Sequence, residues 1–309
     1  MATDFGVRVP SSEFRAHLLV AWRRFLEVWE QVRRSVPAMV GLAILVFFTL
    51  LAILAPLLAP FAPFEAVTLY CDPTCPLSPP SNAYPLGTSA SNTDIYSEVI
   101  WGTQVSLFVG VLAAIVASLV GTFVGLISGF AGGWIDEVMM RFNDVVLSIP
   151  WLVLMIVVAA LIGVIDLTGL ILVIGLTGWS LTARVIRAQV LSVKERMFVE
   201  RAKMVGSSNW HLLVRHIFPN AFPLVFANTI LTVAVSILSE SVLAFLGLST
   251  PDHVSWGKII EDAIANNAVI NGNTAWLVLP GLCIVFLVFG AYLFGYALDE
   301  ILNPRLRRR

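Results

Sequence analysis

The sequence has few charged residues and lacks the motifs that covalent chemistry and nucleotide binding require. Only 13% of its 309 residues are charged, whereas an average soluble domain has roughly 25%. No Gly-x₄-Gly-Lys-Ser/Thr phosphate loop, His-Glu-x₂-His zinc motif or Gly-x-Ser-x-Gly nucleophile elbow occurs. The three cysteines and four histidines have no metal-ligand spacing. These absences predict no catalytic residue, no metal site and no means of binding ATP by the chain itself.

The chain is dominated by apolar sequence, since hydrophobic residues make up 58% of it. They fall into six runs, and about 20 consecutive apolar residues are enough to cross a bilayer. We therefore predict an all-α, polytopic membrane protein with six transmembrane helices. The predicted spans cover residues 36–62, 104–130, 145–165, 167–189, 221–248 and 274–298.

The basic residues are distributed very unevenly between the predicted loops. All of the nineteen Lys and Arg residues except Lys258 fall on one side of the six-span topology. Cytoplasmic loops carry the excess of Lys and Arg in membrane proteins. This predicts that both termini and the loop 198–219 are cytoplasmic. The charged stretch 136–144 is predicted to be a short cytoplasmic break between the second and third spans.

The two ends of the chain are predicted to lie on the cytoplasmic side of the membrane. Residues 1–35 carry an apolar stripe that begins at Phe14 and ends at Val36, flanked by arginines. This pattern is typical of an amphipathic helix on an anionic leaflet, and an ordinary solvated helix is the alternative. Residues 300–309 are predicted to be a basic tail.

Residues 63–100 are predicted to form an extracytoplasmic loop. They contain no Lys or Arg and are rich in Pro and Ser, which is typical of irregular exposed chain. Cys71 and Cys75 lie in this loop, on the side of the membrane where disulfides form. A local disulfide would join them, but the proline in their three-residue spacer can equally hold them apart. Both states remain open.

The second predicted span carries small residues at every fourth position. Such a stripe lies along one face of a helix and lets another helix approach closely. We therefore predict a packing face, used either within the subunit or against a partner. Its members are Ala113, Ala117, Gly121, Gly125 and Gly129.

The longest cytoplasmic segment between two predicted spans contains residues 200–219. Gly206 suits a helix C-terminus because a positive φ costs it nothing. Ser207 or Ser208 then suits the N-cap of a following helix. The sequence predicts two short amphipathic helices here. The second is expected to present one apolar face, made of Trp210, Leu213, Val214 and Ile217.

Five residues of this segment have a spacing that resembles a known motif. The pattern Glu-x-Ala-x₃-Gly-x₁₀-Ile-x-Pro resembles the EAA motif in the permease subunits of binding-protein-dependent ATP-binding-cassette (ABC) importers. In that family the motif lies in a cytoplasmic helix–turn–helix that docks on a separate ATPase subunit. The resemblance implies an ATPase-coupling loop over 198–219, although Arg201 stands where the family usually has Ala. The matching residues are Glu200, Ala202, Gly206, Ile217 and Pro219.

Further passages resemble the second permease subunit, the C component, of dipeptide, oligopeptide and nickel importers. Ser89 departs from the usual Asp after Gly-Thr, and the usual Gly-Arg-Asp is Asn92-Thr93-Asp94 here, with only its Asp retained. These departures lie on the predicted outer side, where they bear on substrate class or receptor docking. The resembling passages are residues 41–60, 85–88, 243–248, 255–257 and 303–306.

The resemblance implies the type I ABC importer permease fold, with a transmembrane type-1 domain over 101–299, in the inner (plasma) membrane. It implies as partners a homologous second permease subunit, two cassette ATPase subunits that hold ATP and Mg, an extracytoplasmic substrate-binding protein and membrane lipid, but no nucleic acid. This chain would form half of a pathway that imports di- or oligopeptides by alternating access. The same architecture importing nickel, an oligosaccharide or another solute is the alternative. A non-transport membrane scaffold or an intramembrane enzyme is an alternative of a different class.

Glu240 is the one acidic residue well inside a predicted span. An ionised side chain in lipid costs at least about 2.5 kcal/mol, so such residues face a partner, a cavity or the bundle interior. Neighbouring serines at positions 236, 239 and 241 offer hydrogen bonds. Two interpretations follow: Glu240 lines the translocation path or its gate, or it makes a purely structural hydrogen bond.

Overall fold

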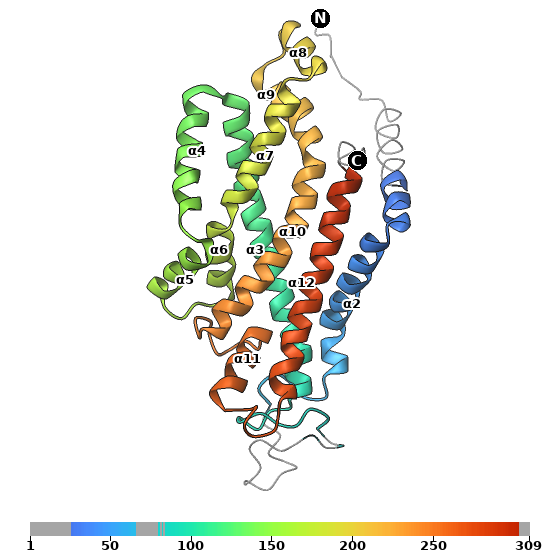
Figure 1. Ribbon diagram of the computed structural model, residues 1–309, viewed down its shortest axis with the longest axis vertical. Helices are drawn as coiled ribbons and strands as arrows, with labels where there is room; N and C mark the ends of the chain where they lie inside the picture. Colours follow the sequence, from blue (N-terminus) through green and yellow to red (C-terminus); the bar gives the residue numbers. More distant parts are fainter. Residues whose placement is uncertain (1–25, 66–79, 81, 83, 303–309) are drawn as a thin grey trace, which may run out of the picture.

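The long helices of the chain run roughly along one common direction (Figure 1). A computed structural model describes residues 26–65, 80, 82 and 84–302. Within these residues the only β-bridges are two isolated ones, Thr88 with Asp94 and Ile165 with Ser249. The helices are α2 (Val36–Leu58), α3 (Ile95–Ala131), α4 (Gly133–Ser148), α5 (Trp151–Ile162), α6 (Leu167–Thr177), α7 (Trp179–Lys194), α8 (Met197–Met204), α9 (Asn209–His211), the π-helix η1 (Leu212–Ile217), α10 (Phe218–Phe245), α11 (Trp256–Ala265) and α12 (Ala275–Leu302).

The predicted all-α membrane fold is confirmed. By length and composition, four helices can each cross a bilayer alone: α2, α3, α12 and the continuous stretch Asn209–Phe245 that ends with α10. Two helix pairs qualify only when each is counted as one span. These are α4 with α5, bent by 84°, and α6 with α7, bent by 44°. The described chain therefore has up to six spans, two of them broken.

The third span, predicted over 145–165, is broken by a sharp bend. α4 ends at Ser148 and α5 begins at Trp151, and Ile149 between them is extended (φ −87°, ψ 127°). Pro150 has no N–H to continue the helix, and a proline disfavours the helical conformation of the residue before it. The chain therefore turns sharply at this point.

The charged stretch 136–144 belongs to helix α4 and is not the predicted loop. Asp136 accepts hydrogen bonds from Nε and Nη2 of Arg187 on α7, both at 2.6 Å. Asp144 accepts one from Arg184, also on α7, at 2.6 Å. Charges in or near a membrane are tolerated when they are paired. These two ion pairs join α4 to α7 and allow a charged helix to continue into a span.

The long helix α3 occupies the centre of the bundle and contacts α2, α6, α7 and α10. Figure 1 shows α8 and α9 at the same end of the molecule as the C-terminal end of α12 and the first described residues, with α11 at the opposite end. The segment 200–219 therefore lies on the same side as both ends of the described chain. This arrangement agrees with an even number of spans.

Only the last part of the predicted amphipathic segment 1–35 lies within the described residues. Residues 26–34 are helical. Val32 is buried in a cluster with α2, α10 and α12, whereas Trp29 and Val36 of the predicted stripe are 39% and 73% exposed. The described part is therefore anchored to the bundle through Val32, and the earlier part of the stripe lies outside the described residues.

Two of the three cysteines also lie outside the described residues. Cys71 and Cys75 belong to this part of the chain, so their pairing stays a prediction. Cys283, the third, lies on α12 and is a free thiol.

Candidate functional site

The segment 200–219 folds as a helix, a glycine turn and the start of a second helix. The first helix and the turn are as predicted, but the second helix is not short, because it continues without a break from Asn209 to Phe245. Gly206 follows the end of α8 with φ +87°, a left-handed conformation that glycine adopts without strain. Ser208 is the N-cap of α9, and its Oγ accepts a hydrogen bond from the amide of His211 at 3.3 Å. The turn is therefore set by the two residue types that were singled out for it.

The apolar face predicted for the second of these helices is only partly correct. Ile217 is fully buried, but Trp210 and Val214 are 73% and 46% exposed, and Leu212 is buried instead. The chain widens into a π-helix at η1, so its side chains rotate away from the positions of a regular helix. Leu212 and Ile217 pack in one cluster with residues of α7 and α8. This cluster anchors the segment to the membrane-spanning bundle.

The segment lies at one end of the bundle (Figure 1). Its tip exposes large apolar side chains: Met204, Val205 and Trp210 are 78%, 87% and 73% exposed. Exposed apolar groups that gather on one surface commonly mark an interaction site. A hollow of about 510 Å³ beside them is bordered by Glu200 and Lys203. Of the motif residues, Glu200, Gly206 and Pro219 are exposed, Ala202 is half-buried and Ile217 is buried.

The small-residue stripe of α3 lies against α6 and α7 of the same chain. A Cβ added to Gly121 would lie 2.6 Å from the carbonyl oxygen of Trp179, and one added to Gly125 would lie 2.6 Å from that of Ala183. These distances leave no room for a side chain, so the backbones of α3 and α7 touch. The structure places all five members inside the bundle: Ala113, Ala117, Gly121, Gly125 and Gly129.

Glu240 lies inside the bundle and is 1% exposed. Its Oε2 accepts a hydrogen bond from Oγ of Ser106 on α3 at 3.0 Å. The same Oγ accepts from the backbone amide of Trp256, at the start of α11, at 3.2 Å. Glu240 therefore supports the position of α11 through Ser106. This geometry favours the structural interpretation of Glu240.

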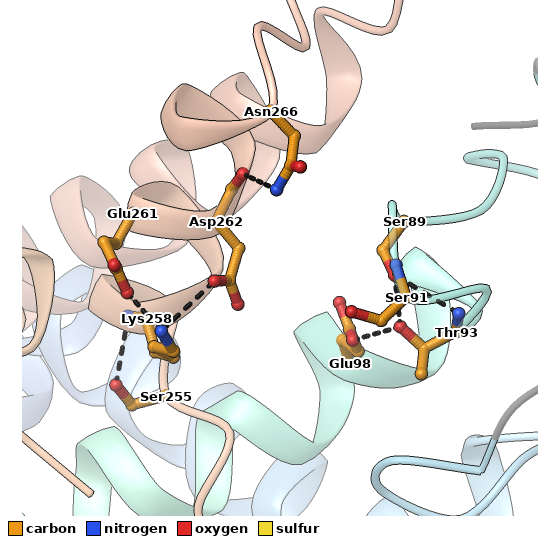
Figure 2. Close-up of polar contacts among 9 residues, drawn as sticks. All are labelled: Ser89, Ser91, Thr93, Glu98, Ser255, Lys258, Glu261, Asp262 and Asn266. Carbon is orange, nitrogen blue, oxygen red and sulfur yellow. Dashed lines mark hydrogen bonds and ion pairs between the residues drawn. The ribbon is translucent and has the colours of Figure 1, made fainter. Parts of the chain in front are cut away.

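Polar residues gather where α11 faces the turn before α3 (Figure 2). This is the end of the bundle opposite α8 (Figure 1). Lys258 forms ion pairs with Glu261 and, at 3.1 Å, with Asp262. Burial opposes the charge of Lys258, but the hydrogen bonds to these two carboxylates outweigh it and raise the pKa of Lys258 above its ordinary value. Across from them Thr93 donates a hydrogen bond to Glu98. The one basic residue predicted outside is therefore neutralised by its own helix.

Two of the residues that depart from the family pattern face inward at this turn. Ser89 and Thr93 are 3% and 5% exposed. Oγ of Ser89 accepts hydrogen bonds from the amides of Ser91 and Thr93, both at 3.2 Å, and pairs with the hydroxyl of Thr93 at 2.5 Å (Figure 2). These side chains close the turn, so they do not form an exposed docking surface.

A cavity of about 490 Å³ lies between α10 and the two broken spans. The residues that line this cavity were not predicted from the sequence. A signal was present, however, because Asn228, Thr232 and Ser236 recur at every fourth position of the otherwise apolar fifth span, and all three line the cavity. Glu240 does not line it. The polar side of the fifth span therefore lies one to three turns away from its single acid.

Two family models match the chain. The first, described as binding-protein-dependent transport system inner membrane component, matches residues 121–308. The second, described as N-terminal TM domain of oligopeptide transport permease C, matches residues 19–80. The first alone covers more than half of the chain, and it includes the segment 200–219, both helix breaks and α11.

Curated proteins of several bacteria are similar over nearly the whole chain. The dipeptide transport system permease protein DppC of Bacillus subtilis (strain 168) is 31% identical, over 91% of this chain and 86% of the relative. The oligopeptide transport system permease protein OppC of Escherichia coli (strain K12) is 36% identical, over 91% and 92%. The glutathione transport system permease protein GsiD of Escherichia coli O6:K15:H31 is 32% identical, over 91% and 90%.

Proposed function

Because the chain belongs to the family of binding-protein-dependent transport system inner membrane components, we propose that it is the subunit through which peptides cross the membrane in an ATP-driven importer. The resemblance to C-component permeases, carried by passages such as residues 41–60, is confirmed by the match of residues 19–80 to the oligopeptide permease C model. The relatives are named for dipeptides, oligopeptides and glutathione. Peptide is the substrate class that these names support best.

The proposed importer contains a homologous second permease, two cassette ATPase subunits and an extracytoplasmic binding protein. The exposed apolar tip formed by Met204, Val205 and Trp210 supports a protein partner at one end of the bundle. We assign this tip to the ATPase subunit, with Glu200 and Gly206 at the contact. We assign the opposite end, where α11 meets the turn before α3, to docking of the binding protein. Lipid covers the apolar side chains exposed along the spans.

In this proposal the cassette subunits bind ATP and Mg and supply the energy for the transport cycle. The chain itself is not an enzyme. Its sequence has no phosphate loop. The segment that carries the tip shares a buried cluster with α7 through Leu212 and Ile217, and α7 touches α3 at Gly121 and Gly125. A push on the tip therefore moves packed helices together, as a rigid-body change between two arrangements requires.

The observation that carries the proposal is the glycine-turn segment 200–219, which is anchored on α7 and exposes an apolar tip. The test is reconstitution of the complete importer in proteoliposomes, followed by uptake of labelled trialanine. Uptake is expected to require ATP, the binding protein and this chain. Vesicles that receive a non-hydrolysable ATP analogue are the control.

Three results would contradict parts of the proposal. ATP-dependent uptake of nickel or of an oligosaccharide, without trialanine uptake, would overturn the peptide assignment and keep the importer. Assembly without ATP-dependent uptake of any solute would favour a scaffold. Chemical conversion of a substrate by the purified chain alone would favour an intramembrane enzyme.

A further inference from the structure

The cavity of about 490 Å³ is bordered by the breaks in both bent spans. Pro150 lies at the first break and Gly178 at the second, and both line the cavity. A Cβ added to Gly178 would lie 3.7 Å from Nε1 of Trp151, so the two breaks adjoin. Interrupted helices at membrane depth are tolerated where they line a cavity. In other classes of transporter, substrate sites are typically built from such discontinuous helices.

Two hydrogen-bonding groups in the lining have no partner. Ser180 is 3% exposed, and its Oγ makes no hydrogen bond; Nε1 of Trp151 is also buried and unpaired. Burying such a group unpaired is unfavourable. The hydrocarbon of a lipid tail cannot satisfy it. An occupant with amide or carbonyl groups can.

The rest of the lining is polar on one side and carries no charge. Asn228 donates from Nδ2 to Oγ1 of Thr182 at 2.9 Å, and Thr232 donates to the carbonyl oxygen of Asn228 at 2.9 Å. No Asp, Glu, Lys or Arg lines the cavity. A cavity of this kind can recognise the backbone of a peptide by neutral hydrogen bonds. It has no means of selecting side chains by charge.

We infer that this cavity is a binding site in the translocation path, where Trp151, Ser180 and Asn228 hold the backbone amides of the peptide in transit. The inference rests on the proposed function. It adds to that function the place where the peptide binds and the chemical groups of the peptide that are recognised. It also explains how one path passes peptides of different charge: the groups that hold them are neutral donors and acceptors.

The test uses the complete importer in proteoliposomes, with trialanine as the probe. Ser180→Ala and Trp151→Phe each remove one hydrogen-bonding group. Ser180→Ala removes little volume, and Trp151→Phe also removes three ring atoms. Uptake at saturating, loaded binding protein is expected to fall about fivefold in each, the effect of one hydrogen bond. Ser118→Ala is a matched control, because Ser118 is 4% exposed with an equally unpaired Oγ but does not line the cavity. Trp134→Phe, at an exposed position on α4, controls for the indole.

A charge placed in the cavity supplies an independent readout. Asn228→Asp is expected to raise the ratio of Ala-Lys-Ala to Ala-Glu-Ala uptake about fivefold over wild type, because the new carboxylate repels the acidic peptide. The binding protein is the same in both reactions, so a change in this ratio arises in the membrane subunit. A variant that merely loosens the fold would slow both peptides alike.

The outcomes separate this inference from the function on which it rests. Wild type that imports no peptide would overturn the proposed function. Normal wild-type uptake with unaffected Ser180→Ala and Trp151→Phe, and an unchanged ratio in Asn228→Asp, would overturn the inference alone. So would a loss of assembled complex without a loss of uptake per complex, because the partner permease would then fill the cavity.

Discussion

Arg187 on α7 donates two parallel hydrogen bonds to Asp136 on α4, from Nε and from Nη2, each 2.6 Å long. The side chains are 31% and 15% exposed, so this pair is partly shielded from solvent. It fixes α4 beside α7, while α5 turns away from α4 by 84°. The position of the broken third span therefore depends on this ion pair and not only on its apolar residues.

Replacing Arg187 by Met is expected to destabilise the protein by about 1–2 kcal/mol, because hydrogen bonds to charged groups contribute about 1.5–3 kcal/mol and this pair is partly exposed. Thermal unfolding in detergent measures the change. Arg184→Met is the matched control: its pair with Asp144 is 57% and 50% exposed, and such pairs contribute about 0–1 kcal/mol. The double variant Arg187→Met/Asp136→Leu should recover part of the loss, since no unpaired charge remains. Equal losses in the two single variants would show that burial of the pair is unimportant.

Gly125 is expected to tolerate no side chain. A Cβ there would lie 2.6 Å from a backbone oxygen of α7, and overpacking of this kind costs about 1–3 kcal/mol. Gly125→Ala should lower the unfolding temperature, and Gly121→Leu or Gly125→Leu should impair folding or assembly. Gly281→Ala on α12 is the control, because nothing lies within 4 Å of its added Cβ; it should be neutral or stabilising. If Gly125→Ala and Gly281→Ala behave alike, α3 and α7 are not in close contact.

The hydrogen bonds that join Glu240, Ser106 and Trp256 are expected to hold α11 in place. Ser106→Ala removes the acceptor of the Trp256 amide and the donor to Glu240, so α11 should exchange its amide hydrogens faster. Hydrogen-exchange mass spectrometry of residues 256–265 measures this. Ser239→Ala is the control, because Ser239 is also buried but bonds only within α10, to Val235. Unchanged exchange in Ser106→Ala would remove the link between Glu240 and α11.

The exposed tip of segment 200–219 is expected to contact the ATPase subunit. In a background without native cysteines, Met204→Cys should cross-link to that subunit in the intact complex, and the yield should differ between nucleotide-free and ATP-trapped states. Glu137→Cys on α4, also exposed, is the comparison. The double variant Glu200→Ala/Gly206→Leu should insert in the membrane but lose assembly or transport. Cross-linking through position 137 and never through 204 would show that the ATPase subunit contacts α4 and not the segment 200–219.

Local chemistry accounts for the features that could be read from the residues alone. The length of an apolar run determines whether it can cross a bilayer, so the runs that can serve as spans were predictable. Gly206 and Ser208 end and begin helices through their own backbone preference and hydroxyl group. The small residues at every fourth position of α3 mark a packing face for the same reason: the helix repeat puts them in one line.

Contacts between distant residues decided the rest. Asp136 pairs with an arginine 51 residues away, so a stretch that has the composition of a loop becomes a helix. Glu240 bonds with Ser106, 134 residues away, and this places it in the core and away from the cavity. The cavity itself exists because the Pro150 break comes to lie beside the Gly178 break. Periodicity within one helix carries no information on which helix will face it, and only packing in three dimensions brings these residues together.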